Sequence, residues 1–220
     1  MTAGGRRGRY HHGDLRTALI DTAIELIDER GVRGFSVAEA SRRLGVAVSA
    51  PYAHFADREE LLAAVAVHAY EVFVAELRPQ LTRFRAPARR LAAIARAYVR
   101  FAGTHRPLFD VIFGAGIDKV RHPEVKDAER PVTDAVLDCV QALAGGDAAS
   151  EELSGAVEAA AHGHALLLLD GDFGHGEQAV ELAAERAARV TLALVGSRHL
   201  LGRPFEPVRR AEPATRGRPT

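Results

Sequence analysis

The sequence predicts an all-α protein, with a three-helix unit near the N-terminus followed by a larger helical bundle. Three observations lead to this fold class. No segment alternates between apolar and polar residues with the period of two that a half-buried strand requires. Apolar residues instead recur at intervals of three and four, the spacing of one helix face. Glycine and proline, which end helices, cluster in the intervals between these segments.

The composition favours a cytoplasmic protein. With 220 residues, 47% of them hydrophobic, the chain can build an ordinary core in one large or two small domains. The formal net charge is zero, so any affinity for nucleic acid must come from a local group of charges. The single cysteine, Cys139, excludes an intramolecular disulfide and fits a reducing cytosol. No apolar run has the length of a membrane span, and the N-terminus lacks the apolar core of a signal peptide.

Residues 1–12 form a short basic segment, which we expect to be a flexible arm. Arg6, Arg7 and Arg9 lie between glycines, and no carboxylate interrupts them. Such an arm is either a solvated terminus or, on DNA, a source of contacts with phosphates or an A·T-rich minor groove. The three arginines are therefore candidate DNA contacts.

A first long helix is expected over residues 13–31, with Gly31 at its end. Its apolar residues repeat at helical spacing and would support the two short helices that follow: Leu15, Leu19, Ala23, Leu26 and Ile27.

Two short helices around a glycine turn are expected next. Ser36 and Glu39 have the Ser-x-x-Glu spacing of a capping box, so the first should begin at Ser36. Gly45 supplies the left-handed residue that ends it. The second should run over residues 48–55, with Pro51 near its first turn, where a missing N–H costs least. This arrangement, over about residues 36–55, is a helix-turn-helix, whose second helix enters the DNA major groove.

The remaining segments predict longer helices. Asp57 can cap a helix over residues 58–84, in which Pro79 is expected to cause a kink or an end. Five further helices are expected in a bundle, at residues 87–103, 106–113, 124–143, 151–169 and 177–195. Residues 202–220 are rich in proline and arginine and should be a disordered tail.

Specific residues in the first unit resemble the TetR family of dimeric transcriptional repressors. They are Gly45-Val46, then Tyr52-Ala53-His54-Phe55, then Arg58-Glu59-Glu60-Leu61-Leu62. The resemblance covers roughly residues 13–73. It implies a DNA-binding domain there, a ligand-binding and dimerisation domain over residues 87–197, and a long helix that transmits changes between them.

The resemblance also implies which residues meet DNA. Tyr52, His54 and Arg58 match positions that contact phosphates, although Tyr52 could partly pack in the core and His54 could be a plain surface residue. The candidates at base edges are Val48, Ser49, Ala50 and Pro51, and those at the start of the preceding helix are Ser36, Val37 and Ala38. Only Ser49 among the base-edge candidates has a hydrogen-bonding side chain, so the sequence predicts no particular operator.

In the second domain the resemblance extends to a TetR subfamily named for Trp, His and Gly. Residues 106–114 and the Ala161-His162-Gly163 segment match its signatures, but Glu158 stands where that subfamily has its tryptophan. An apolar cavity for a small effector is expected between the helices. The candidate lining residues are Tyr98, Phe101, Phe109, Phe113 and His162, each of which could equally be plain core.

The helices at residues 151–169 and 177–195 are rich in alanine and leucine on most faces. Pairing with the same helices of a second copy would cover them, as the resemblance implies, and would make a palindromic operator the matching target. The alternative is an intramolecular bundle.

Metal binding is not expected. His162, His164, Asp170, Asp172 and His175 are close in sequence, but positions 162 and 164 lie about 200° apart on a helix, and the spacing matches no structural zinc pattern. No cofactor is expected either.

The predicted function is that of a ligand-responsive DNA-binding regulator, most simply a repressor, with no enzymatic activity. We find no nucleophile with a base at a recognisable spacing, no phosphate loop and no paired carboxylates on one helix face. The alternative is an all-α enzyme, or a carrier of a metal or ligand, that uses the first unit only as a scaffold.

Overall fold

The computed structural model describes residues 12–201, and this part of the chain is helical with no strand, so the all-α prediction is confirmed. The predicted arm, with Arg6, Arg7 and Arg9, and the predicted tail lie outside the described residues. The helices are α1 (His12–Gly34), α2 (Val37–Leu44), η1 (Ala50–Ala53), α3 (Arg58–Arg83), α4 (Pro87–Thr104), α5 (Arg106–Gly114), α6 (Pro123–Ala144), α7 (Asp147–Leu169), α8 (Glu177–Gly196) and η2 (Arg198–Leu200).

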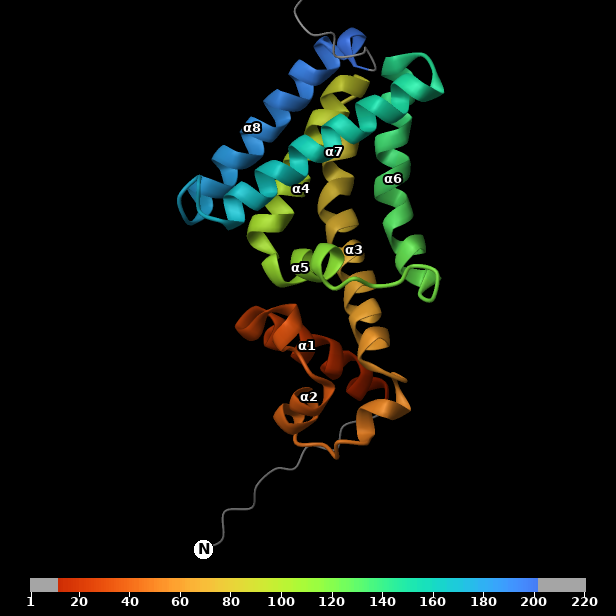
Figure 1. Cartoon of the computed structure of the whole chain (residues 1–220), viewed down its shortest axis with the longest axis vertical. Coiled ribbons are helices and arrows are strands. Elements are labelled where there is room, and N and C mark those ends of the chain that lie inside the picture. Colours follow the sequence, from red (N-terminus) through yellow and green to blue (C-terminus); the bar gives the residue numbers. More distant parts are fainter. Residues whose placement is uncertain (1–11, 202–220) are drawn as a thin grey trace, which may run out of the picture.

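The helices form two groups joined by α3. Helices α1 and α2 lie at one end of the molecule, and α4, α6, α7 and α8 form the bundle at the other (Figure 1). Helix α3 runs from the first group into the second, contacting α1 near its start and α4 and α6 farther along. The short helix α5 lies between the groups and contacts both α1 and α3. No helix in residues 12–201 combines the length and apolar character needed to cross a membrane.

Local capping explains why the first group folds as the sequence predicts. The Ser36 hydroxyl accepts a hydrogen bond from the Glu39 amide at 3.2 Å, so Ser36 is the N-cap of α2. Gly45 adopts φ 67°, the left-handed conformation that ends α2. Asp57 caps α3 in the same way as Ser36 caps α2, accepting from the Glu60 amide at 2.9 Å. These three boundaries are confirmed.

Two other boundaries differ from the prediction, those of α1 and α7. Helix α1 does not stop at Gly31 but resumes after it to Gly34, because Gly31 takes φ 70° and interrupts the helix without ending it. Helix α3 ends at Arg83, within one residue of the predicted end, and Pro79 lies inside it. Helix α7 begins at Asp147 rather than Glu151, because Gly145 and Gly146 turn the chain within two residues.

The second short helix is the largest difference. It is a single 3₁₀ turn, Ala50–Ala53, rather than an α-helix over residues 48–55. Pro51 has no N–H to donate, and the bonds from Tyr52 to Ser49 and from His54 to Pro51 span three residues. With Pro51 in its first turn, the segment forms a single 3₁₀ turn and does not continue as an α-helix.

Candidate DNA-binding surface and ligand cavity

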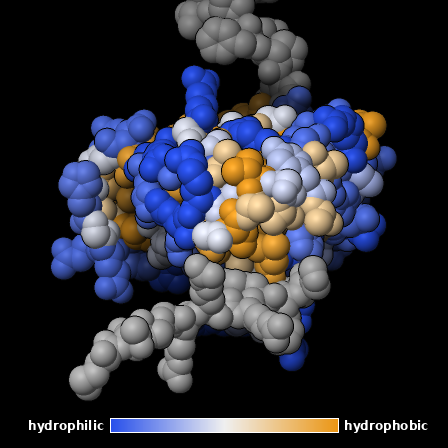
Figure 2. Space-filling view, turned by 90° about the horizontal axis from the view of Figure 1, so that it is seen from below, coloured by the Kyte–Doolittle hydropathy of each residue, from blue (hydrophilic) through white to orange (hydrophobic). Residues whose placement is uncertain are grey.

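The end of the molecule that carries α2 and η1 exposes two large apolar side chains. Val48 and Tyr52 are each 54% exposed, and Ser49 beside them is also exposed. Viewed from this end, apolar residues gather near the middle of the face, with hydrophilic residues around them (Figure 2). The tip (residues 45–55) thus presents a largely apolar surface, on which the hydroxyl groups of Ser49 and Tyr52 are the exposed hydrogen-bonding groups.

The remaining candidates for DNA contact, apart from the exposed Arg58, are less accessible. Ala50, His54, Ser36 and Ala38 are partly exposed. Pro51 and Val37 are buried, and Val37 packs in the core of the first helical group. The structure therefore brings the candidates together at one end, with Val48, Ser49 and Tyr52 outermost.

Arg58, the predicted phosphate contact, is bound to the backbone of the preceding segments. Its Nε donates to the carbonyl of Phe35 at 3.1 Å and its Nη2 to the carbonyl of Val32 at 2.5 Å. The guanidinium carbon also lies 5.6 Å from the centre of the Phe35 ring. Arg58 thus connects the start of α3 to the last turn of α1 and to the residue that follows α1, a role that the sequence pattern does not indicate.

An ion pair between Arg43 and Glu29 holds α2 against α1. Arg43 Nη1 and Nη2 donate to the two carboxylate oxygens of Glu29 at 2.7 and 2.8 Å, the forked geometry favoured by arginine. This contact lowers the pKa of Glu29, chiefly through the hydrogen bond from Arg43. Together with Arg58 it fixes the orientation of the tip relative to α1.

The segment between α5 and α6, which we call the α5–α6 loop (residues 115–122), contacts the start of α3. Arg121 Nη1 lies 2.5 Å from Glu59 Oε2 and its Nη2 lies 3.4 Å from Asp57 Oδ2. The Asp118 amide donates to the other Glu59 oxygen at 3.2 Å. The loop of the second group is therefore tied to the cap of the helix that follows the tip.

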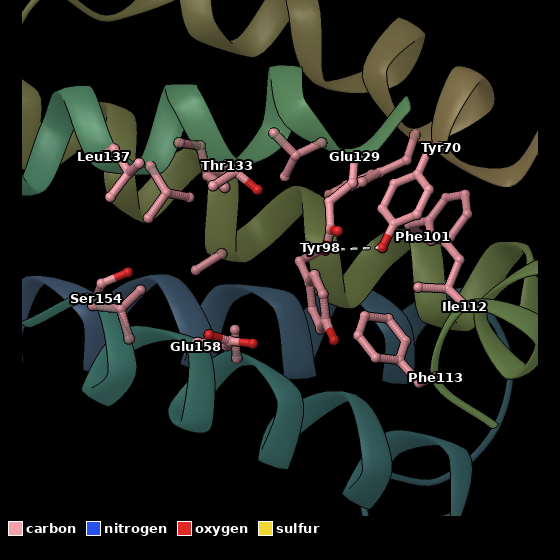
Figure 3. A pocket seen from close by; sticks show the side chains of 17 residues that line it. Tyr70, Tyr98, Phe101, Ile112, Phe113, Glu129, Thr133, Leu137, Ser154 and Glu158 are labelled. Atoms are coloured by element: carbon pink, nitrogen blue, oxygen red, sulfur yellow. Dashed lines mark hydrogen bonds between the residues drawn. The ribbon is translucent and has the colours of Figure 1, made fainter. Parts of the chain in front are cut away.

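A cavity of about 220 Å³ lies among α3, α4, α5, α6 and α7 (Figure 3). Its walls carry five aromatic rings: Tyr70, Phe73, Tyr98, Phe101 and Phe113. Three of the five predicted ligand residues, Tyr98, Phe101 and Phe113, are among them. The sequence analysis did not identify Tyr70 and Phe73, which belong to α3.

The other two predicted ligand residues, Phe109 and His162, do not line the cavity but lie behind its wall. His162 Nδ1 is 2.8 Å from the Tyr98 hydroxyl, and the Phe109 ring stacks on the imidazole with centres 5.9 Å apart. His162 is thus a hydrogen-bonded member of the aromatic group. His164, by contrast, bonds the carbonyl of Ala160 at 2.7 Å, and residues 12–201 contain no cluster suited to a metal ion.

The polar side chains of the cavity were also missed. They are Glu129 and Thr133 of α6 and Ser154 and Glu158 of α7, on opposite sides of the cavity (Figure 3). One signal was available: Glu129 precedes Val132 and Val136 at helical spacing, so a carboxylate lies on an otherwise apolar face.

The two glutamates lie near the two tyrosines. The Tyr70 hydroxyl donates to Glu129 Oε1 at 3.1 Å, drawn as the dashed line in Figure 3. Burial, followed by the charge of Glu129, raises the pKa of Tyr70, and burial followed by the charge of Glu158 raises the pKa of Tyr98. Both phenols therefore keep their protons at neutral pH.

The surface of α7 and α8 exposes several leucines. Leu166, Leu167, Leu182 and Leu192 are between 44% and 46% exposed. These side chains form the apolar surface that the sequence analysis expected on these two helices.

Comparison with family models gives two matches in different parts of the chain. Residues 19–65 match the model described as "Bacterial regulatory proteins, tetR family". Residues 91–195 match the model described as "Tetracyclin repressor-like, C-terminal domain". Together the two ranges span more than half of the chain. A search of curated proteins finds no match.

Solved structures similar to this chain include a protein of unknown function from Rhodococcus sp. RHA1, with a TM-score of 0.67 and 28% identity over 85% of this chain and 98% of that one. AibR, solved with isovaleryl coenzyme A and operator DNA, gives a TM-score of 0.61 and 17% identity over 80% and 96%. FadR from Bacillus subtilis, solved with stearoyl-CoA, gives 0.59 and 16% over 83% and 98%. At these identities the last two similarities concern the fold alone.

Proposed function

The chain belongs to the TetR family of bacterial regulatory proteins, and from this premise we propose that it is a homodimeric repressor released from a palindromic operator by a small molecule. As a member of this family it is a DNA-binding transcriptional regulator. The operator, the dimer and the direction of regulation are the parts that we propose.

One observation supports DNA binding most directly: the tip exposes Val48, Ser49 and Tyr52 while Arg58 and Arg43 fix its orientation. A rigidly held turn can present the same surface to each site it meets. AibR, a neighbour in fold, was solved with operator DNA. We propose that Tyr52, His54 and Arg58 contact phosphates and that Val48, Ser49 and Ala50 lie at base edges.

The exposed leucines of α7 and α8 support the homodimer. Four large apolar side chains of similar exposure on one helix pair are costly in water and favour burial against a second copy. A two-fold dimer presents two tips to DNA about one helical turn, or a multiple of it, apart, which is why we propose a palindromic operator.

The cavity supports control by a small molecule. Two neighbours in fold, AibR and FadR, were solved with acyl-coenzyme A ligands. Tyr70 and Phe73 line the cavity and belong to α3, whose first turn is tied to the α5–α6 loop through Arg121. We propose that a ligand moves α3 and this loop together and so changes the distance between the two tips.

We further propose that the protein acts in the cytoplasm and performs no catalysis. Its family consists of regulators, and the ionisable groups of the cavity lining are two carboxylates and two phenols that keep their protons. The alternative, an all-α enzyme or a carrier, is not favoured by the comparisons.

Selection of bound sequences from random duplex DNA tests this function. We expect enrichment of one inverted repeat, whose half-site spacing reports the separation of the two tips. Enrichment of no sequence over bulk DNA at moderate ionic strength would remove the proposal.

A further inference from the structure

We propose that the cavity binds a small organic cation, an amine or quaternary ammonium with an apolar body, whose charge lies beside Glu158 and Glu129. The inference rests on the proposed function, because it names the chemical class of the effector for that cavity.

The charges of the residues that line the cavity favour a cationic ligand over an anionic one. Glu129 and Glu158 are its two ionisable acids, and none of its seventeen lining residues within the described chain is lysine, arginine or histidine. An anionic ligand would place its charge near two carboxylates with no lining cation to compensate it. A cation meets the carboxylate of Glu158 and, beyond it, that of Glu129, which Lys119 occupies in this structure.

The aromatic rings that line the cavity also favour a cationic ligand. Five rings line the cavity with the two glutamates: Tyr70, Phe73, Tyr98, Phe101 and Phe113. Figure 3 shows Tyr70, Tyr98, Phe101 and Phe113 gathered at one end of the cavity, with Glu129 beside them. The negative face of an aromatic ring attracts a cation within about 6 Å of its centre, and more strongly where water is excluded. A wall of rings next to carboxylates is suited to an alkylammonium group, and the apolar residues around it to the rest of the ligand.

Lys119 shows how an alkylammonium group binds at one side of the cavity. Its ammonium donates to Glu129 Oε2 at 2.5 Å and lies 6.0 Å from the centre of the Tyr70 ring. The corner formed by Glu129 and Tyr70 therefore already holds an alkylammonium. Glu158, on the other side of the cavity, forms no hydrogen bond or ion pair with any residue in the described range.

Access and size are consistent with a small ligand. Glu158 of α7 and Thr133 and Leu137 of α6 line the cavity and are also exposed, so the cavity can be reached from solvent beside these two helices. A volume of about 220 Å³ accommodates a molecule with one ring and a short chain. Glu158 is exposed whereas Glu129 is partly buried, so Glu158 is the more accessible of the two carboxylates.

Displacement of Lys119 would couple this ligand to the DNA-binding end. Lys119 belongs to the α5–α6 loop, and its neighbours Asp118 and Arg121 hold Glu59 and Asp57 at the start of α3. An ammonium that takes the place of Lys119 on Glu129 frees one of the contacts that position this loop.

The test uses three probes that share a phenylbutyl body: 4-phenylbutylamine, 4-phenylbutan-1-ol and 4-phenylbutanoate. Binding to the full-length protein is measured by calorimetry at pH 7.5, where the amine is protonated. We expect the amine to bind most tightly and the carboxylate at least roughly tenfold more weakly.

Two variants locate the charge preference. Glu158→Gln keeps the shape of the side chain and should weaken the amine roughly tenfold while changing the alcohol little. Glu151→Gln, an exposed position on the same helix outside the cavity, is the matched control and should change neither.

Equal or tighter binding of the alcohol or the carboxylate overturns the proposal, as does an unchanged amine affinity in Glu158→Gln. Absence of binding by all three probes at millimolar concentration overturns it too. The DNA selection described above uses the same preparation. An enriched inverted repeat beside a failed amine preference leaves the regulator standing and removes only the cationic effector.

Discussion

Tyr98 of α4 and His162 of α7 are joined by a hydrogen bond of 2.8 Å between the phenol oxygen and Nδ1. The bond connects two helices that both contact the cavity, and Phe109 stacks on the histidine from behind. The tautomer of His162 decides which of the two groups donates, and the bond joins α4 to α7 in either case. The pair therefore holds one wall of the cavity in place.

Tyr98→Phe removes this bond and leaves Nδ1 of His162 without its partner. We expect the free energy of unfolding, measured by chemical denaturation, to fall by about 1 kcal/mol. Tyr52→Phe removes an exposed hydroxyl at the tip and should change it by less than about 0.5 kcal/mol. A Tyr98→Phe protein as stable as the unmodified one would show that the bond contributes little.

Arg58→Ala tests whether one side chain both positions the tip and contacts DNA. Loss of the bonds to Val32 and Phe35 should lower stability by about 1 kcal/mol. If Arg58 also meets a phosphate, the slope of log affinity against log salt should flatten by roughly one. Reduced affinity with an unchanged slope would restrict Arg58 to its structural role.

Arg121→Ala should separate ligand binding from DNA release. The substitution removes the contacts with Glu59 and Asp57 but touches no residue of the cavity lining. We expect affinity for a bound amine to persist, while the loss of operator affinity that the amine causes falls several-fold. Arg130→Ala is the matched control, because Arg130 pairs with Asp127 of its own helix. Full release in Arg121→Ala would exclude the loop as a route.

Leu167→Glu and Leu192→Glu test the dimer. A charge on this apolar surface cannot be buried against the same surface of a second copy without a large desolvation cost. We expect monomers by light scattering at micromolar concentration, together with lost operator binding. Val120→Glu changes an apolar side chain that is 90% exposed on the α5–α6 loop and should leave the assembly intact.

The acid stability of the first helical group should depend on Asp57. Its folded pKa is lowered, chiefly by the hydrogen bond from the Glu60 amide and further by Arg121. Because the pKa is lower in the folded state, ionised Asp57 stabilises the fold at pH values above the pKa of the unfolded chain. This stabilisation is lost as the pH falls through the pKa of the folded state. Asp57→Asn keeps a capping side chain without the charge. We expect the difference in the free energy of unfolding between the unmodified protein and Asp57→Asn to shrink as the pH falls below roughly 4. Urea denaturation at a series of pH values measures this difference.

Sequence reasoning succeeded where the determinants are local. Ser36, Gly45 and Asp57 act within one turn of their own position, so their patterns specify the helix ends. The prediction of an α-helix over residues 48–55 is wrong. Proline is common in the first turn of an α-helix, but here Pro51 lies at the start of a single 3₁₀ turn, Ala50–Ala53.

The candidate site was predicted less completely, because five helices distant in sequence build it. Tyr98, Phe101 and Phe113 were found as rings on apolar faces, whereas Glu129 and Glu158 were not. The sequence could show that each glutamate has apolar helical neighbours, but not that both lie at one cavity. The bond between Tyr98 and His162 likewise depends on how α4 packs against α7.

Helix α3 has 26 residues, and at a rise of about 1.5 Å each it is a rod of about 39 Å. Its first turn adjoins the tip, while Tyr70 and Phe73 stand midway along it in the cavity wall. A tilt of about 5° around its Arg83 end would carry Asp57 roughly 3 Å, close to the spacing of one base step along a duplex. A tilt this small does not require the bundle to unpack. It would still change the distance between the two tips of a dimer enough that they no longer match the spacing of the DNA half-sites.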